Sequence, residues 1–336
     1  MKPVYWKSKI ISAGFAWLAH VMELCNQSSV AEFVLLGLAE GDMTETMLFV
    51  LFLVIYLITL VGNCTIVMLI RVEHRLHTPM YFFLLHLSLL DICYSTVTIP
   101  QMLVHLLSRH KAISFVRCAF QMYIFVVFGN AECVLMSLMA YDRYVAICHP
   151  LHYTSIINWH FCSWTTGAAW LSGFLNSLIV NAFALRLPYC IQNRINQFFC
   201  EVLAMIKLAS GDSSEAEIAV FVFGSLLLLL PFILIAASYA RIGIAILHIR
   251  SAEGQYRAIS TCGSHLLVVS LFYGTALFAY MRPSSVSSAT GQDKAVSVFY
   301  TMVTPMMNPL IYSLRNKEVK GALRKLLSKK TTAPNM

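Results

Sequence analysis

The chain has 336 residues, of which 58% are hydrophobic and 12% are charged, and its mean hydropathy is +0.70. A soluble globule of this size needs more polar surface than that, so the composition excludes one and indicates an integral membrane protein. The formal net charge of +8 comes from basic residues scattered between apolar runs and concentrated after Leu314, which fits lipid headgroups better than nucleic acid.

The first 46 residues precede the first long apolar run. Residues 1–21 place three lysines ahead of an apolar stretch, which is the layout of a weak secretory signal or of an N-terminal extension. Residues 22–46 are expected to lie outside the membrane, because from Glu23 to Glu45 they hold five acids and no Lys or Arg. Asn26 begins an N-x-S motif there and is the expected glycosylation site.

Seven apolar runs follow within residues 47–314, and most of them exceed the roughly 20 residues that a membrane-spanning helix needs. Runs of this length exclude the short alternating strands of a membrane barrel. The sequence therefore predicts an all-α membrane protein with a seven-transmembrane helix bundle. The expected spans are 47–70, 80–107, 115–147, 161–185, 219–249, 258–281 and 295–314.

Residues 315–336 are predicted to form a short amphipathic eighth helix and a tail. Apolar residues recur there at helical spacing opposite lysines and arginines, which favours a helix lying on the membrane surface. The apolar positions are Val319, Ala322, Leu323, Leu326 and Leu327.

The distribution of basic residues predicts the orientation. Thirteen Lys and Arg fall on the side of the C-terminus, against eight on the other side from Met22 onward. By the positive-inside rule the N-terminus is extracellular and the C-terminus cytoplasmic.

Asp91 and Glu132 are the only carboxylates well inside apolar runs, and intramembrane acids are functional candidates by default. They could share a cation such as sodium, or one could stay protonated, because two close carboxylates do not both ionise cheaply. A proton relay in a transporter is a further alternative. Such a relay needs more acids or basic partners, and helices four to seven supply none.

The end of the third apolar run carries the block MAYDRYVAICHPLHY, residues 139–153. A bare Asp-Arg-Tyr triplet could merely anchor a helix end. The longer block, with PMMNPLIY near the end of the seventh run, closely resembles the signature of odorant receptors, a branch of the rhodopsin-like G-protein-coupled receptors. The resemblance covers roughly Val30 to Leu327.

This resemblance implies several roles. It favours sodium bound between Asp91 and Glu132. Prolines in the seventh helix should kink it, because a proline removes a backbone donor. The residues expected to form the G-protein coupling and activation switch are Asp142, Arg143, Tyr144, Tyr239, Asn308, Pro309 and Tyr312.

The resemblance also implies a cavity among helices three, five, six and seven for a small, volatile, largely apolar odorant. Binding would activate a stimulatory, olfactory-type G protein and raise cAMP at the plasma membrane. The expected cavity wall is Phe125, Val126, Gly129, Asn130, Phe223, Tyr273, Ala276, Leu277, Tyr280 and Thr301.

Other functions fit the sequence less well. A rhodopsin-like receptor for a non-odorant ligand remains an alternative, although an amine ligand usually requires an acid where this chain has Phe125. A transporter would ordinarily show internal repeats or matched broken helices, and none is found. No metal-ligand cluster points to an enzyme.

Two disulfide questions follow from the resemblance. Cys118 and Cys200 match the cysteines that pair across rhodopsin-like receptors, so we expect that bridge. The usual partner of Cys190 is replaced here by Ser210. Cys190 is therefore expected to stay free or to mispair, with Cys25 as a speculative substitute.

Overall fold

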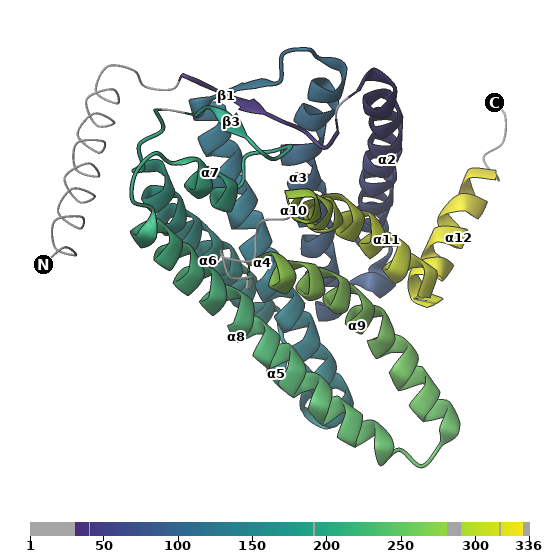
Figure 1. Cartoon of the computed structure of the whole chain (residues 1–336). Coiled ribbons are helices and arrows are strands. Elements are labelled where there is room, and N and C mark those ends of the chain that lie inside the picture. Colours follow the sequence, from purple (N-terminus) through teal and green to yellow (C-terminus); the bar gives the residue numbers. More distant parts are fainter. Residues whose placement is uncertain (1–30, 40, 191, 281–289, 316, 332–336) are drawn as a thin grey trace, which may run out of the picture.

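The computed structural model describes residues 31–39, 41–190, 192–280, 290–315 and 317–331. The predictions for residues 1–21, for Cys25 and for glycosylation at Asn26 fall outside these ranges. Within them the chain folds as a bundle of long helices with a small sheet at one end, drawn at the top of Figure 1.

The predicted seven-helix bundle is confirmed, with the helix ends within a few residues of the expected spans. Shorter helices connect some of the segments: η1 (His74–Leu76), η2 (Pro150–His152) and α5 (Tyr153–Ile156). The first six segments are α2 (Asp42–Val72), α3 (Pro79–Leu107), α4 (Phe115–Cys148), α6 (Trp159–Leu185), α8 (Ser214–Leu247) and α9 (Ala252–Tyr280). Within the described residues, these six are the helices long and apolar enough to cross a membrane.

The seventh segment is broken into pieces. It consists of α10 (Thr290–Val298), the π-helical turn η4 (Phe299–Val303) and α11 (Thr304–Arg315). Pro305, at the start of α11, has no N–H to donate to the carbonyl four residues earlier, so the regular ladder cannot continue through this point. Each piece is therefore shorter than a membrane span, although together they cover the predicted one.

Pro309 explains how the first and seventh segments pack. Its missing N–H leaves the Pro305 carbonyl without the usual helical donor, and Asn63 supplies one, with Nδ2 3.1 Å from that oxygen. Gly62 permits the approach, because a Cβ at this position would lie 2.9 Å from Cγ of Pro309. Gly62 and Asn63 thus pack the first segment against the seventh.

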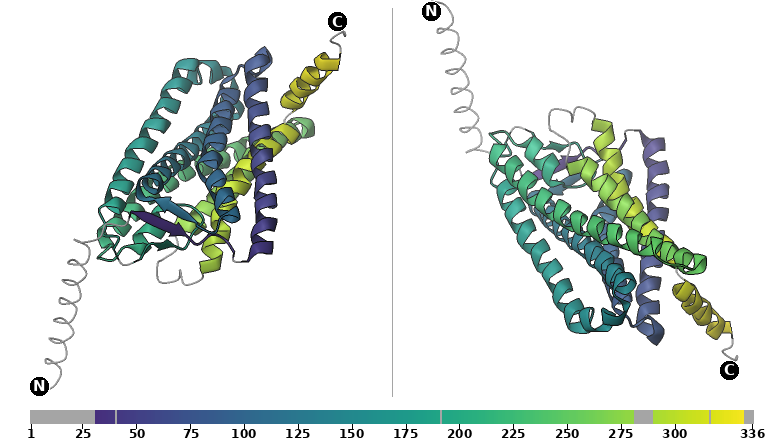
Figure 2. Two further views of the ribbon diagram at one scale, coloured as in Figure 1. Left: turned by 90° about the horizontal axis from the view of Figure 1, so that it is seen from above. Right: turned by 90° about the horizontal axis from the view of Figure 1, so that it is seen from below.

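The outer faces of the bundle are apolar. Large hydrophobic side chains stay exposed along α2 and α8, among them Leu57 at 50% and Leu230 at 56%. The helix α4 instead packs against α3, α6, α8 and α9; Figure 2 shows the bundle from above and from below. A chain with exposed apolar helices around a buried central helix fits a lipid environment.

A three-stranded sheet in the order β2–β1–β3 covers one end of the bundle, which we call the sheet end. The strand β1 (Glu32–Leu35) pairs antiparallel with β2 (Ala112–Ser114) and parallel with β3 (Arg194–Ile195). Phe33 and Leu35 are buried beneath it. The sequence analysis did not predict this sheet.

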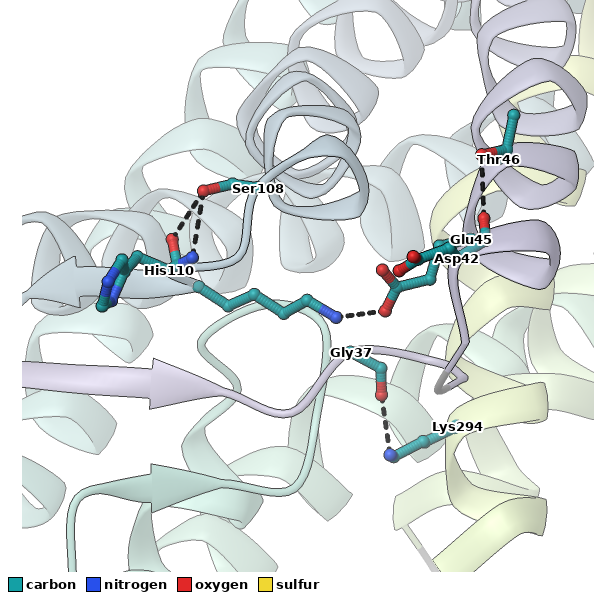
Figure 3. Close-up of polar contacts among 8 residues, drawn as sticks. Gly37, Asp42, Glu45, Thr46, Ser108, His110 and Lys294 are labelled. Atoms are coloured by element: carbon teal, nitrogen blue, oxygen red, sulfur yellow. Dashed lines mark hydrogen bonds and ion pairs between the residues drawn. The ribbon is translucent and has the colours of Figure 1, made fainter.

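Polar contacts fasten the N-terminal segment across the sheet end (Figure 3). Lys294 of α10 donates to the carbonyl of Gly37 at 2.7 Å, and Lys111 pairs with Glu45 at the start of α2. Gly37 has a φ of 70°, which glycine adopts without steric cost. The segment after β1 is thereby tied to the seventh helical segment, and the connection before β2 is tied to the first.

The predicted eighth helix is present as α12 (Lys317–Thr331). Val319 and Ala322 are buried against the bundle, while Glu318 accepts a hydrogen bond from Tyr81 at 2.6 Å and Lys325 pairs with Glu73 at 2.8 Å. These contacts join α12 to the connection between α2 and α3. The pattern is amphipathic, as predicted.

Candidate functional site

A cavity of about 100 Å³ lies inside the bundle toward the sheet end. Its wall is mainly aliphatic and aromatic with a few polar groups, as in small-molecule sites. The helix α4 contributes Phe125, Val126, Gly129, Asn130 and Cys133. The rest of the wall is Tyr94, Asn176, Val180, Val202, Val220, Gly224, Leu228, Phe272, Ala276 and Tyr300.

Half of the residues predicted for the wall line this cavity, namely Phe125, Val126, Gly129, Asn130 and Ala276. On α4 all four of the named residues line the cavity, because residues three and four positions apart lie on one face of a helix. The residues from α6, and Val202 of the short helix α7 (Val202–Leu208), were missed. The expected cavity included neither the fourth membrane segment, which is α6, nor the long loop that follows it.

On α8, α9 and the seventh segment, most of the predicted residues do not line the cavity, and often the adjacent residue does. Phe223, Tyr273 and Thr301 do not line the cavity, whereas their neighbours Gly224, Phe272 and Tyr300 do. One residue turns a helix by about 100°, so a small error in rotation moves a side chain off the wall.

The off-wall residues have other contacts. The hydroxyl of Tyr273 donates to the Cys133 carbonyl at 3.2 Å, and that of Thr301 donates to the Ser297 carbonyl at 2.6 Å. Leu277 packs on the central core and Phe223 on the core beneath the sheet. The side chain of Tyr280 lies outside the described residues.

Aromatic rings close the cavity at the sheet end. Phe125 has its ring centroid 4.6 Å from that of Tyr94, 4.9 Å from that of Phe199 and 6.1 Å from that of Tyr300. Phe199 belongs to the long loop after α6, so this loop reaches down to the cavity wall. The loop therefore helps to close the cavity at this end.

A buried carboxylate next to these rings was missed by the sequence analysis. Glu201 is 7% exposed and accepts a hydrogen bond from Tyr300 at 3.1 Å and one from Gln197 at 3.2 Å. Gln197 also donates to Ser297 at 2.9 Å, which links the loop to the seventh segment. Burial raises the pKa of Glu201 to about 7. Only the fold revealed it, because in the sequence Glu201 stands among ordinary loop residues.

The loop is held by disulfide bonds. Cys118 and Cys200 are bridged with an S–S distance of 2.02 Å, which confirms the expected pair. The Cys200 N–H also donates to Gln121 at 2.8 Å. Cys190 is disulfide-bonded too, so the prediction that it stays free is wrong. The reason is that Ser210, at the usual partner position, leaves the Cys190 thiol available to another cysteine.

Beneath the cavity lie the two intramembrane acids. Asp91 is fully buried, and Nδ2 of Asn308 donates to both of its carboxylate oxygens at 3.0 Å. Glu132 is 2% exposed, lies close enough to Asp91 to interact electrostatically, and its Oε1 has no hydrogen-bond partner among the described residues. The predicted residues Asp91, Glu132 and Asn308 are thus brought together.

The opposite end of α4, which we call the Arg143 end, holds the Asp-Arg-Tyr triplet. Tyr153 donates to Asp142 at 2.7 Å, and Tyr144 shares a hydrogen bond with His149 at 3.0 Å. Asp142 and Arg143 form no ion pair within the described ranges, although Arg143 lies close enough to Asp142 to interact with it electrostatically. Arg143 is 9% exposed.

Arg143 nevertheless lies among side chains from three other segments. It is close enough to Tyr239, His265 and Tyr312 to interact electrostatically with each of them. Tyr239 and His265 share a hydrogen bond of 2.8 Å between α8 and α9. The sequence analysis did not single out His265. Helix α4 therefore connects a cavity, a buried acid pair and a cationic end.

This arrangement suits binding more than catalysis. The described residues hold no cluster of three or more His, Cys, Asp or Glu that could bind a metal ion. The cavity wall carries no charged side chain, so its chemistry favours an uncharged ligand held by shape and apolar contact.

Comparisons with known proteins agree on one family. A family model described as "Olfactory receptor" matches residues 52–330. The chain is 51% identical to human olfactory receptor 2D2 over 92% of this chain and 99% of that protein. It is also 51% identical to the dog olfactory receptor-like protein OLF3 over 91% of this chain and 96% of that protein.

A solved structure supports the fold. The crystal structure of squid rhodopsin is similar with a TM-score of 0.66 and 17% identity, over 88% of this chain and 89% of that one. At this identity the likeness concerns the fold alone.

Proposed function

This chain belongs to the olfactory receptor family, and from that premise we propose that it binds a small, largely apolar, volatile molecule and activates a stimulatory G protein, which raises cAMP. The observation that carries the proposal is the cavity, which has no charged side chain among its described lining residues and lies against α4, the helix that also carries Arg143. A volatile molecule is small and poorly hydrated, so apolar contact supplies most of its affinity.

The proposed mechanism is a shift between two states of the bundle. A ligand that fits the cavity better in one state moves the population toward that state. Asn130 and Arg143 lie thirteen residues apart on α4, about 20 Å along the helix. Contacts of α4 with α8 and α9 give the ligand a route to the Tyr239–His265 pair, whose separation would free Arg143 for a G protein.

The same proposal includes an orientation. We infer that the sheet end is extracellular and that the Arg143 end and α12 face the cytoplasm, in the plasma membrane. The disulfide at the sheet end supports this, because disulfides persist in oxidising compartments. The excess of basic residues on the other side supports it as well.

A sodium ion fits the acid pair as a cofactor. Glu132 has a buried oxygen without a partner and Asp91 lies close by; buried carboxylates are costly unless they are neutralised or paired. Asp91 and Glu132 would hold the ion, with Asn308 positioning Asp91. When bound, sodium would supply a positive charge that stabilises both acids in the resting state.

A ligand screen on cells that express the full chain tests the proposed function. The measurement is cAMP against ligand concentration, with surface expression recorded for every sample. We expect uncharged volatile molecules to raise cAMP with a saturable dose response. The absence of a response to any volatile compound, with the receptor at the cell surface, would contradict the proposal.

A further inference from the structure

Two amide side chains interrupt an otherwise apolar cavity wall. Asn130 comes from α4 and Asn176 from α6, and both line the cavity. Tyr300, another polar member of the wall, already bonds through its hydroxyl to Glu201 and Ser297. The two asparagines are therefore the amide groups that the wall offers to a ligand.

Neither amide is satisfied by the protein. Among the described residues, nothing bonds to Nδ2 of Asn130 or to Oδ1 of Asn176, and both atoms are shielded from solvent. Asn176 is only 6% exposed. Buried polar groups are nearly always hydrogen-bonded, so an unmet donor and an unmet acceptor in one cavity call for a partner that the chain does not supply.

The packing of α4 on α6 brings the two amides toward each other. Ser177 donates to the Tyr123 carbonyl at 2.6 Å, and a Cβ at Gly173 would lie 2.7 Å from the Val127 carbonyl oxygen. The helices are therefore antiparallel in this region. Continuing that register puts Asn176 level with residue 124, about 9 Å along the axis from Asn130.

The direction of the side chains reduces that separation. In a helix every Cα–Cβ bond leans toward the N-terminus. Asn130 therefore leans toward the sheet end, while Asn176, on the antiparallel helix, leans the opposite way. The two amides therefore lean toward each other along the bundle axis.

From this geometry we propose that Asn130 and Asn176 together select ligands that carry a hydroxyl group, with Nδ2 of Asn130 donating a hydrogen bond to the hydroxyl oxygen and Oδ1 of Asn176 accepting one from the hydroxyl O–H. A hydroxyl is the smallest group that is both donor and acceptor. The ligand class is then a small apolar alcohol. This inference rests on the proposed function, because it names the ligand of that same cavity.

Other ligand groups satisfy the pair less well. An ether or a carbonyl oxygen accepts from Asn130 but leaves Oδ1 of Asn176 unmet, and a hydrocarbon leaves both amides unmet. A site built to bond a hydroxyl rejects an analogue that lacks it, because the buried polar groups of the site are then left unpaired. The order of potency should be alcohol, then carbonyl compound or ether, then hydrocarbon.

The test compares matched sets of compounds on cells expressing the full chain. Each set holds an alcohol, the aldehyde or ketone, the methyl ether and the hydrocarbon with the same number of non-hydrogen atoms, on linear, branched, cyclic and aromatic skeletons. We expect the alcohols to be most potent, by about tenfold over the ether of the same set. Equal potency of alcohol and ether would overturn the proposal, and would indicate that the amides hold only water.

Variants locate the preference at the two asparagines. Asn176→Leu and Asn130→Leu keep the branching at Cγ but remove the polar atoms, whereas Asn176→Ala and Asn130→Ala leave space. All four variants should reduce the potency of the alcohol about tenfold. The two Asn176 variants should change the potency of the ether of the same set by no more than about twofold. Loss of the response to every compound in both Leu and Ala variants, at normal surface expression, would contradict a role limited to the hydroxyl.

A matched control lies on the same helix. Thr166 of α6 also has a buried hydroxyl without a partner, yet it does not line the cavity, so Thr166→Val should keep the alcohol preference. The outcomes also separate this inference from the proposed function. If only carbonyl compounds, acids or thiols raise cAMP, the proposed hydroxyl site is wrong and the proposed receptor function stands. If no compound raises cAMP, both the hydroxyl site and the receptor function are contradicted.

Discussion

The two ends of the bundle are held together in different ways. At the Arg143 end, the functional side chains come from long helices and meet through short polar contacts, such as Tyr153 with Asp142 and Tyr239 with His265. At the sheet end, loops and the N-terminal segment are fixed by strand pairing and by the Cys118–Cys200 bridge. The difference teaches that the Arg143 end can rearrange by exchanging weak contacts, whereas the sheet end is a covalently fixed cover for the cavity.

The largest expected effect comes from removing the Cys118–Cys200 bridge at the sheet end, which covers the cavity. Cys118→Ala should remove the bridge to Cys200, and loss of a native disulfide costs about 2–5 kcal/mol, a large part of a typical folding free energy. We expect surface expression and signalling to be nearly abolished, as measured by flow cytometry of an N-terminally tagged receptor. Cys64→Ala, at an exposed free cysteine, is the control and should behave as wild type. Normal surface delivery of Cys118→Ala would show that the cover does not need its bridge.

At the other end, Arg143→Ala should separate signalling from folding. Arg143 lies near the end of α4, is surrounded by polar side chains of other segments and forms no ion pair within the described ranges, so surface expression should be retained. Odorant-dependent cAMP should fall about tenfold or more, in line with typical coupling between sites. Asp142→Asn should do the opposite and raise basal cAMP, because it weakens the resting contacts of the triplet. Full signalling by Arg143→Ala would remove this residue from the mechanism.

The acid pair lies between the two ends and should respond to sodium. If Asp91 and Glu132 hold the ion in the resting state, sodium should raise the melting temperature of the purified receptor by mass action. Asp91→Asn and Glu132→Gln should each abolish that dependence. The reference is the melting temperature in potassium chloride at equal ionic strength. An equal sodium response in wild type and both variants would show that no shared site exists.

The smallest effect should come from Glu201, the buried acid of the cover. Burial raises its pKa from 4.5 to about 7, so the folded state holds a proton more tightly than the unfolded state. Its contribution to stability is then greatest below about pH 4.5 and is lost as the pH rises through about 7. Glu201→Gln keeps an acceptor for Tyr300 but cannot ionise.

The measurement for Glu201 is melting temperature against pH. Between about pH 4.5 and pH 7, we expect the melting temperature to fall less with rising pH in Glu201→Gln than in the wild type. Above about pH 7 the variant should melt a few degrees higher. Asp212→Asn is the control, because hydrogen bonds from Ser214 lower the pKa of Asp212 and place its titration below the window. Parallel curves for Glu201→Gln and wild type would mean that Glu201 does not titrate there.

The cysteines show where sequence reasoning reached its limit. The Cys118–Cys200 bridge was expected from the resemblance, and the structure has it. Ser210 led to the expectation that Cys190 stays free, yet Cys190 is bonded. None of the other cysteines in the described ranges is its partner. Pairing with Cys25 therefore stays a prediction, which peptide mapping under non-reducing conditions can test.

The sequence by itself determined the bundle, because long apolar runs leave a helix as the way to satisfy every backbone group in lipid. It also determined which residues of α4 share a face, since fixed helical spacing decides that. The rotation of the later segments was decided by tertiary structure: the break at η4 depends on how Pro305 and Pro309 are accommodated by Gly62 and Asn63. The cover and the unmet amides of Asn130 and Asn176 likewise exist only in the fold, because contacts between residues far apart in the chain leave no periodic signal in the sequence.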